Sequence, residues 1–378
     1  MTSSTTAPAP TWEAPLAGAP LDATVEIPGS KSLTNRLLVL AALAEGPGTL
    51  RGALRSRDAD LMIRALRTLG ARIEVGDHPS TLHVTPGPVA GGTEVDTGLA
   101  GTVMRFLPPF AALADGPVRF DGDPEARVRP MLPVLAALRT LGVTVHDPGS
   151  SSAELPTHLP FTVEGRGSVP GGAVDADASE SSQFVSGLLL AAARFERGLT
   201  LRHIGATLPS LPHIEMTVAT LRDAGVVVDD SRDGMWGVAP GPIAARDVRV
   251  EPDLSNAAPF LASALVAGGT VRIPGWPTLT TQPGAMVPEL LERMGGTYTL
   301  ADGVLSVTGT GKIHGIDVDL RAGGELAPTF AALAALADSP PGSGASRTCV
   351  ATRPTAWRRW PARSRGSADR PRRPATAW

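Results

Sequence analysis

The chain is organised around one stretch, Pro28-Gly29-Ser30-Lys31-Ser32-Leu33-Thr34-Asn35-Arg36. An alternating run precedes it and an apolar run follows, so the order predicts a strand, a tight loop and a helix. Ser30 or Ser32 can cap that helix by accepting a backbone N–H bond. Lys31 and Arg36 then put two cations beside the positive end of the helix. The stretch predicts an anion site, although a capped helix under a solvated loop gives the same pattern.

One junction recurs four times: the end of a helix, a glycine suited to a left-handed cap, and an alternating strand. The four junctions run through residues 66–75, 138–146, 221–229 and 291–299. An Ala-rich helix and a short β run lie upstream of each. The elements form a unit of strand, helix, strand, helix, strand, strand with a period of roughly 70 to 85 residues. The pattern predicts a mixed α/β protein and favours duplication, although any α/β protein contains such junctions.

Polar loops lead into several of the predicted helices, where exposed backbone N–H groups can bind an anion. The loops lie at residues 96–105, 121–130, 177–184 and 208–213. One of them holds Arg127 and Arg129 beside Pro130, which makes a rigid basic turn. Asp253 or Ser255 can cap a further helix. Glu325 stands at another helix start, where its carboxylate favours the helix dipole or accepts a substrate hydroxyl. Together the loops favour one polyanionic small molecule held at several helix ends.

Composition excludes several classes of protein. A length of 378 residues predicts two domains, and a net charge of −3 gives no reason to expect nucleic acid or an anionic membrane as partner. The single Cys349 excludes a disulfide framework, and the seven histidines never take a metal-ligand spacing. No apolar run is long enough for a membrane span, and the first twenty residues do not resemble a signal peptide. We therefore expect a cytoplasmic protein.

The last forty residues differ from the rest of the chain. From Ser339 to Trp378 there is no periodicity, Pro and Arg dominate, and three of the six tryptophans occur there. This composition is typical of a disordered segment. We expect the tail to lie outside both domains.

Five motifs, in order along the chain, resemble those of the 5-enolpyruvylshikimate-3-phosphate synthase family, also called 3-phosphoshikimate 1-carboxyvinyltransferase. They are P-G-S-K-S-x-T-N-R at 28–36, L-A-G-T-x-M-R at 99–105, Arg129-Pro130, S-S-Q-F at 181–184 and D-x-S-x-A at 253–257. The likeness covers residues 20–338. The family transfers the enolpyruvyl group of phosphoenolpyruvate to the 5-hydroxyl of shikimate 3-phosphate, in the shikimate pathway to aromatic amino acids. It uses neither metal nor cofactor.

The resemblance also implies an architecture of two lobes, each built from three βαβαββ units that close on the substrates. On this basis the first lobe comprises residues 21–28 and 249–338, and lacks its last unit. The second lobe comprises residues 29–248, with three units. Residues 1–20 form a disordered arm and residues 339–378 an aberrant tail. We expect a monomer.

The site residues implied by the resemblance form two overlapping groups. Shikimate 3-phosphate would contact Lys31, Ser32, Arg36, Ser181, Ser182, Ser210 and Glu325. Phosphoenolpyruvate would contact Lys31, Gly101, Thr102, Arg129 and Gln183. Lys31 and Glu325 are the expected catalytic residues, with Glu325 near the substrate hydroxyls as a possible base. The two substrates together carry two phosphates and two carboxylates, which cations and helix N-termini can bind. A charged tetrahedral intermediate is stabilised by preorganised hydrogen-bond donors.

Three residues depart from the family pattern. Leu99 replaces a usual Asn, His213 stands where a tyrosine or similar ring is common, and Glu325 replaces a shorter aspartate. The rival enzyme acting on UDP-N-acetylglucosamine usually has Asn at the position of Ser32 and a reactive active-site Cys, whereas Cys349 lies in the tail. An ATP-binding module is disfavoured because no Walker A glycine precedes Lys31. A remnant that binds shikimate 3-phosphate without turnover stays open.

The tail has the signature of a shifted reading frame. Soon after the Glu325 helix the family has a segment resembling x-E-T-D-R-L, which brings a glutamate and an arginine to phosphoenolpyruvate. Residues 348–361, back-translated and read one base earlier, can spell H-L-R-G-H-E-T-D-R-L-A-A-L-A. The tryptophan codons restrict their neighbours strongly, so the match is improbable by accident. We predict that the chain lacks its sixth unit and that its catalysis is absent or very weak.

Overall fold

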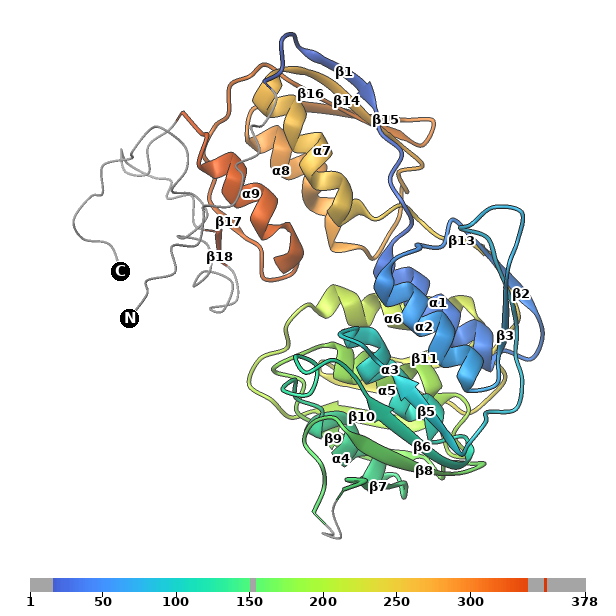
Figure 1. Ribbon diagram of the computed structural model, residues 1–378. Coiled ribbons are helices and arrows are strands. Elements are labelled where there is room, and N and C mark those ends of the chain that lie inside the picture. Colours follow the sequence, from blue (N-terminus) through green and yellow to red (C-terminus); the bar gives the residue numbers. More distant parts are fainter. Residues whose placement is uncertain (1–15, 150–153, 339–349, 352–378) are drawn as a thin grey trace, which may run out of the picture.

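The computed structural model describes residues 16–149, 154–338 and 350–351. Figure 1 shows two bodies joined by two chain segments. Helices and mixed sheets alternate along the chain, which confirms the predicted mixed α/β class. One buried apolar core is built from residues between 38 and 250, and a second from residues between 254 and 333. We call the bodies that surround these cores the second lobe and the first lobe, respectively.

Three four-stranded sheets enclose the second lobe in the described chain. One has the order β13 (Asp247–Arg249), β2 (Gly48–Arg51), β4 (Leu82–Thr85), β3 (Arg72–Val75). The next has the order β5 (Thr93–Asp96), β6 (Asp115–Asp121), β8 (Phe161–Arg166), β7 (Thr144–His146). The third has the order β9 (Gly172–Ala176), β10 (Leu199–His203), β12 (Met235–Val238), β11 (Val228–Asp229). In each sheet the first two strands are parallel and the remaining neighbours are antiparallel.

Six helices fill the space between these sheets. They are α1 (Lys31–Leu43), α2 (Arg57–Thr68), α3 (Gly101–Ala111), α4 (Leu132–Thr140), α5 (Gln183–Ala192) and α6 (Leu211–Asp223). Helices α1, α3 and α5 pack against one another in the centre, and α2, α4 and α6 pack between them. Burial follows this arrangement, since nearly every residue of α3 and α5 is buried. The apolar runs that predicted helices are therefore core segments.

The first lobe repeats the same sheet once. Its order is β1 (Leu21–Thr24), β14 (Gly269–Pro274), β16 (Val304–Gly309), β15 (Thr297–Ala301), with β1 parallel to β14 and the others antiparallel. Its helices are α7 (Leu254–Ala267), α8 (Val287–Arg293) and α9 (Ala327–Ala334), with 3₁₀ turns η1 (Pro283–Met286) and η2 (Gly324–Leu326). Strand β17 (Val318–Asp319), which precedes α9 in the chain, pairs in parallel with β18 (Val350–Ala351), which follows it. The strand β18 falls inside the segment predicted to be a disordered tail; the rest of that segment lies outside the described residues.

Two strands are exchanged between distant parts of the chain. Strand β13 follows the third sheet in sequence but pairs with β2, and β1 precedes the second lobe but pairs with β14. The second lobe is thus inserted between the first strand of the first lobe and its next helix. The repeat seen in the sequence did not predict this exchange, because the paired strands are far apart in the chain.

The four predicted helix–glycine–strand junctions are confirmed. Gly70, Gly142, Gly225 and Gly295 all have positive φ, between 78° and 104°, where a glycine costs least. The arginine in three of the junctions reaches over the glycine to a strand carbonyl: Arg67 to Ile73, Arg139 to Val145 and Arg222 to Val228. The fourth junction has Glu292 at this position and makes no such bond. The Leu-Arg-x-x-Gly pattern therefore has a structural cause.

Candidate active site at the lobe boundary

The segments that connect the lobes, residues 28–30 and 251–253, lie side by side. Two backbone bonds join them, one donated by the Ser30 N–H (2.8 Å) and one by the Asp253 N–H (2.9 Å). Gly29 also permits the close approach of the loop after β2, because a Cβ there would lie 2.0 Å from the Gly52 carbonyl oxygen. We call this pair of connecting segments the crossing. It fixes the start of α1 at the lobe boundary.

Two helix starts share this crossing. The Ser30 hydroxyl caps α1 by accepting the Leu33 N–H at 3.4 Å, which confirms one of the two predicted caps. The Asp253 carboxylate caps α7 by accepting the Asn256 N–H at 3.0 Å, as predicted. The same carboxylate accepts the backbone N–H of Lys31 at 3.2 Å. The first turn of α1 is thus tied to the first turn of α7 in the opposite lobe.

The Lys31 side chain is half exposed and points to a carboxylate. Its Nζ lies 3.5 Å from Asp58 Oδ2, in the first turn of α2. Sequence reasoning did not identify Asp58. The available signal was its place after the cap residue Ser56, at a helix start like those already singled out.

Arg36 lies in the interior, so of the two cations predicted beside the start of α1 it is Lys31 whose side chain is half exposed. The Arg36 side chain spans from α1 to α5 and α6 and is 1% exposed. Its donors reach Thr217 Oγ1 (2.8 Å), the Ser32 carbonyl (2.8 Å), the His213 carbonyl (2.8 Å) and Ser186 Oγ (3.3 Å). Burial lowers the pKa of Arg36 to about 9, because the charged form loses its hydration. Sequence periodicity could not show that this cation turns inward.

Three predicted residues meet at the start of α3. A Cβ added to Gly101 would lie 3.0 Å from Arg129 Nη2 and 3.2 Å from Gln183 Oε1, so both side chains pack on the glycine. Arg105 Nη1 donates to Gln183 Oε1 at 3.0 Å, and Arg129 Nη1 donates to the Leu99 carbonyl at 3.0 Å. The starts of α3 and α5 and the basic turn before α4 therefore form one polar cluster.

Thr102 faces the other way from this cluster. It is 7% exposed, and its Oγ1 accepts a hydrogen bond from Asn35 Nδ2 at 2.7 Å. The bond joins α1 to α3 inside the second lobe. Thr102 therefore stabilises the arrangement of the two helices, which a short motif alone could not indicate.

The predicted serine loop precedes α5. Ser181 Oγ accepts the Gln183 N–H at 3.3 Å, and Ser182 is the N-terminal cap residue of α5, at 5% exposure. His203 at the end of β10 supports the loop, since its Nδ1 accepts the Ala178 N–H at 3.2 Å. His203 was not among the predicted residues, and its position in a strand gave no signal.

Ser210 has an unusual backbone conformation. It precedes α6 with φ 55° and ψ 52°, in the left-handed region, and its side chain makes no cap bond to the helix. In the described chain Asp302 is the other non-glycine residue with positive φ. Such strain in a non-glycine residue is common at functional sites.

Glu325 comes to the same boundary from the first lobe. Its Oε1 lies 3.8 Å from Nε2 of His213, which is in the first turn of α6. Both side chains are partly buried, at 34% and 21% exposure. Partial burial raises the pKa of Glu325, and the nearby Asp253 charge raises it further, while bonds from its own N–H and Ser255 oppose the shift. Glu325 is therefore a carboxylate that gains a proton more readily than usual.

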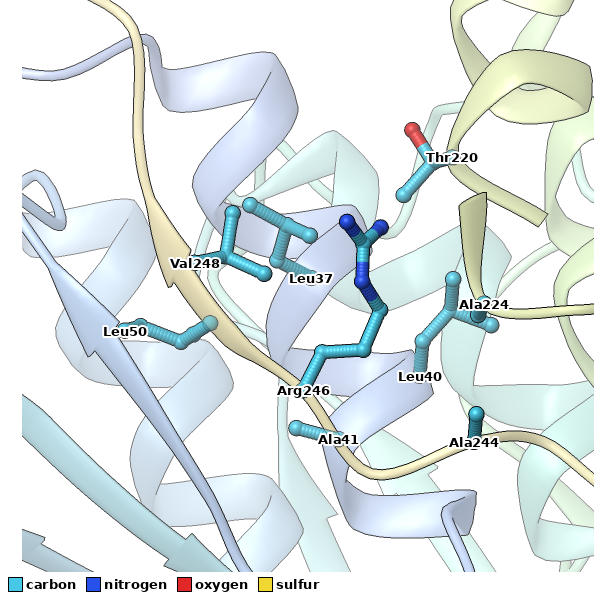
Figure 2. Close-up of a pocket in the computed structure, with 9 residues that line it drawn as sticks. All are labelled: Leu37, Leu40, Ala41, Leu50, Thr220, Ala224, Ala244, Arg246 and Val248. Carbon is cyan, nitrogen blue, oxygen red and sulfur yellow. The ribbon is translucent and has the colours of Figure 1, made fainter. Parts of the chain in front are cut away.

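The hollow in Figure 2 lies elsewhere. It is lined by residues of α1, β2, β13, the end of α6 and the segment before β13, and Arg246 extends across it toward Thr220. Its volume of about 20 Å³ holds little more than one water molecule. No cluster of three metal-ligating side chains occurs in the described residues. Nor does any described helix have the length and apolar character to cross a membrane.

Comparison with known proteins gives a consistent result. A family model described as EPSP synthase (3-phosphoshikimate 1-carboxyvinyltransferase) matches residues 16–347. Two structures of EPSP synthase from Acinetobacter baumannii are similar, each at 24% identity and TM-score 0.67, over 83% of this chain and 71% of theirs. The enolpyruvyl transferase NikO from Streptomyces tendae is similar at 19% identity and TM-score 0.64, over 85% of this chain and 74% of its own. At these identities the structures establish the shared fold.

Proposed function

Because the chain belongs to the EPSP synthase family, we propose that the polar cluster at the lobe boundary is the site of enolpyruvyl transfer. The family's reaction moves the enolpyruvyl group of phosphoenolpyruvate to the 5-hydroxyl of shikimate 3-phosphate and releases phosphate. One observation supports the location above the others. Hydrogen bonds link the starts of α1, α3, α5 and α6, so four helix N-termini meet where the first lobe approaches.

The proposed phosphoenolpyruvate site is the cluster on Gly101. Arg129 supplies a charge-assisted donor, and Gln183 supplies an amide whose oxygen is already taken by Arg105. Lys31 would reach it by leaving Asp58, an exchange of one anionic partner for another. Thr102 would act from the interior through Asn35. This arrangement leaves N–H donors facing the ligand, which suits a phosphate and a carboxylate.

The proposed shikimate 3-phosphate site lies on the α1, α5 and α6 starts. Its residues would be Lys31, Ser32, Arg36, Ser181, Ser182 and Ser210 from the second lobe, and Glu325 from the first. Serine hydroxyls and helix N-termini suit a phosphate monoester. Arg36 would contribute by fixing the Ser32 and His213 carbonyls, and any direct contact with the ligand would need this buried side chain to move.

A titration series tests the proposal. Isothermal titration calorimetry should show binding of shikimate 3-phosphate, and no comparable binding of UDP-N-acetylglucosamine or ATP. Lys31→Ala should weaken the affinity for shikimate 3-phosphate by roughly tenfold or more, since a charge-assisted bond contributes about 1.5–3 kcal/mol. Arg72→Ala is a control, because Arg72 is an exposed cation of β3 in the second lobe whose partner is Glu74. An unchanged affinity in Lys31→Ala would remove Lys31 from the site.

A second candidate function is binding without turnover. It is supported by the first lobe, where the described residues complete one four-stranded sheet and a single further strand pair. An assay of phosphate release in the presence of both substrates distinguishes the two candidates. A remnant would bind shikimate 3-phosphate but release no phosphate. The monomeric state and the cytoplasmic location expected from the sequence stay predictions.

A further inference from the structure

His213 and Glu325 approach each other from opposite lobes. His213 belongs to α6 of the second lobe, whereas Glu325 lies in η2 of the first lobe, just before α9. The distance of 3.8 Å between Nε2 and Oε1 is within ion-pair range but longer than a hydrogen bond. The pair is thus a contact between side chains of the two lobes at the proposed site.

The backbone of His213 is firmly held. Its carbonyl accepts hydrogen bonds from Arg36 Nη2 (2.8 Å), Thr217 Oγ1 (3.0 Å) and Ser186 Oγ (3.4 Å). Arg36 and Thr217 are themselves almost fully buried. The imidazole is therefore attached to a fixed point of the second lobe, and at 21% exposure it keeps little freedom of its own.

Glu325 is much less constrained within its own lobe. It lies between the exposed Gly324 and the buried Leu326 in a single 3₁₀ turn, and its side chain has three rotatable bonds. Asp253, of like charge, is close enough to raise its pKa, and Ser255 donates to it. Lys31, a cation of the other lobe, gives its backbone N–H to Asp253 and its Nζ to Asp58. His213 is the partner that the described contacts offer to Glu325, and it is a cation when its imidazole is protonated.

We propose that His213 is a positioning residue: it holds the Glu325 carboxylate across the lobe boundary, ionised and directed at the hydroxyls of shikimate 3-phosphate. This inference rests on the proposed function. A protonated imidazole favours the carboxylate form that burial and Asp253 disfavour. It also couples the lobes, because an ion pair at 3.8 Å tightens when they approach. A contact from the opposite lobe also restricts the rotatable bonds of the glutamate side chain.

The contact is tested first without ligand. In protein labelled with ¹³C at glutamate carboxyls, and assigned with Glu325→Gln, the Glu325 titration midpoint should rise in His213→Phe. A rise of about one pH unit is expected from loss of a cation at this distance. His146→Phe is the matched control, since His146 pairs with Glu164 at 2.8 Å in the second lobe. An unchanged Glu325 midpoint in His213→Phe overturns the pairing.

The positioning role is tested by a double-mutant cycle on shikimate 3-phosphate binding. At pH 6, His213→Phe and Glu325→Gln should each raise the dissociation constant for shikimate 3-phosphate by roughly five- to tenfold. The dissociation constant of the double variant should be no higher than that of Glu325→Gln. His146→Phe should bind normally. If the fold-changes of the two single variants multiply in the double variant, the residues act independently, and the positioning role is overturned. Absence of binding in the native protein would instead overturn the proposed function, and with it the positioning role.

Discussion

The two lobes are built from the same unit but differ in how completely it is repeated. In the second lobe three sheets surround α3 and α5, and nearly every residue of these helices is buried. In the first lobe the described α9 buries only Ala327, Phe330 and Leu333, and α7 leaves Phe260 47% exposed. A βαβαββ unit thus covers one side of its first helix, and its neighbours in the lobe must cover the others. An apolar helix face left open in this way favours association or unfolding.

The largest expected effect comes from the reading frame. Restoring the frame from about Ser339 should supply the remaining strands of the first lobe and the missing part of the phosphoenolpyruvate site. Turnover should then rise at least a hundredfold, because lobe closure over the substrates becomes possible, and the melting temperature of the first lobe should increase. Phosphate release and calorimetry measure the two effects.

Two observations decide the frame prediction. A variant of restored length but scrambled sequence after residue 338 controls for the mere presence of extra chain. Resequencing of the gene tests the frame directly. Full turnover by the purified 378-residue chain would show that the frame prediction is wrong.

Truncation of one side chain in each lobe should show the difference in packing. Leu189→Ala, in the centre of α5, should cost about 2–5 kcal/mol in the free energy of unfolding, because it opens a cavity in a closed core. Phe260→Ala, on the open face of α7, should cost less than about 1 kcal/mol, since half of that ring is already in water. Urea titration of both variants measures the costs. Equal losses would mean that the face of α7 is covered in solution.

Lowering the pH should change the stability of the two lobes in opposite directions. In the second lobe, partial burial raises the pKa of Asp121, but bonds from Arg127 and the Gly122 N–H outweigh it, and the net shift is downward. Asp121 therefore stabilises the fold above its unfolded pKa, and this is lost as pH falls through its lower folded pKa. The pKa of Glu325 is raised, so the first lobe gains stability as pH falls through that value toward the unfolded one.

Variants separate these two contributions. Asp121→Asn should remove the acid-dependent loss, and Glu325→Gln should remove the gain, when the free energy of unfolding is followed from pH 7 to pH 3. If Glu325→Gln leaves the pH profile unchanged while weakening shikimate 3-phosphate binding, the carboxylate serves the ligand alone. If it changes only the profile, the binding role fails.

The smallest expected effect concerns the junction arginines. Arg139→Met should destabilise the second lobe by about 1 kcal/mol, because it removes the bond to the Val145 carbonyl. Glu292→Arg should introduce the same bond in the first lobe, toward the carbonyl of Tyr298, and stabilise it by up to about 1 kcal/mol. Thermal unfolding of both variants is the measurement. No gain in Glu292→Arg would show that the fourth junction differs in geometry as well as in sequence.

Local signals predicted the elements well, but they did not indicate which distant strands pair; the grouping of residues 21–28 with 249–338 came from the family resemblance. Glycine caps such as Gly142 and the cap residues Ser30 and Asp253 were predicted because each depends on neighbours within a few residues. Strand exchange, the burial of Arg36 and the approach of His213 to Glu325 join residues from different units. Such contacts arise from tertiary packing, which neither periodicity nor a short motif records.

The crossing of the two connecting segments has a consequence for biosynthesis. Strand β1 leaves the ribosome first, but its partner β14 follows only after the whole second lobe has been made. The intervening segment begins and ends at one place, at Ser30 and Glu251, so it can fold as a unit while β1 waits unpaired. A change of reading frame near the 3′ end of the message therefore affects a chain whose second lobe can already be folded. Its structural effect is confined to the first lobe, whose first strand is made first and whose last elements are made last.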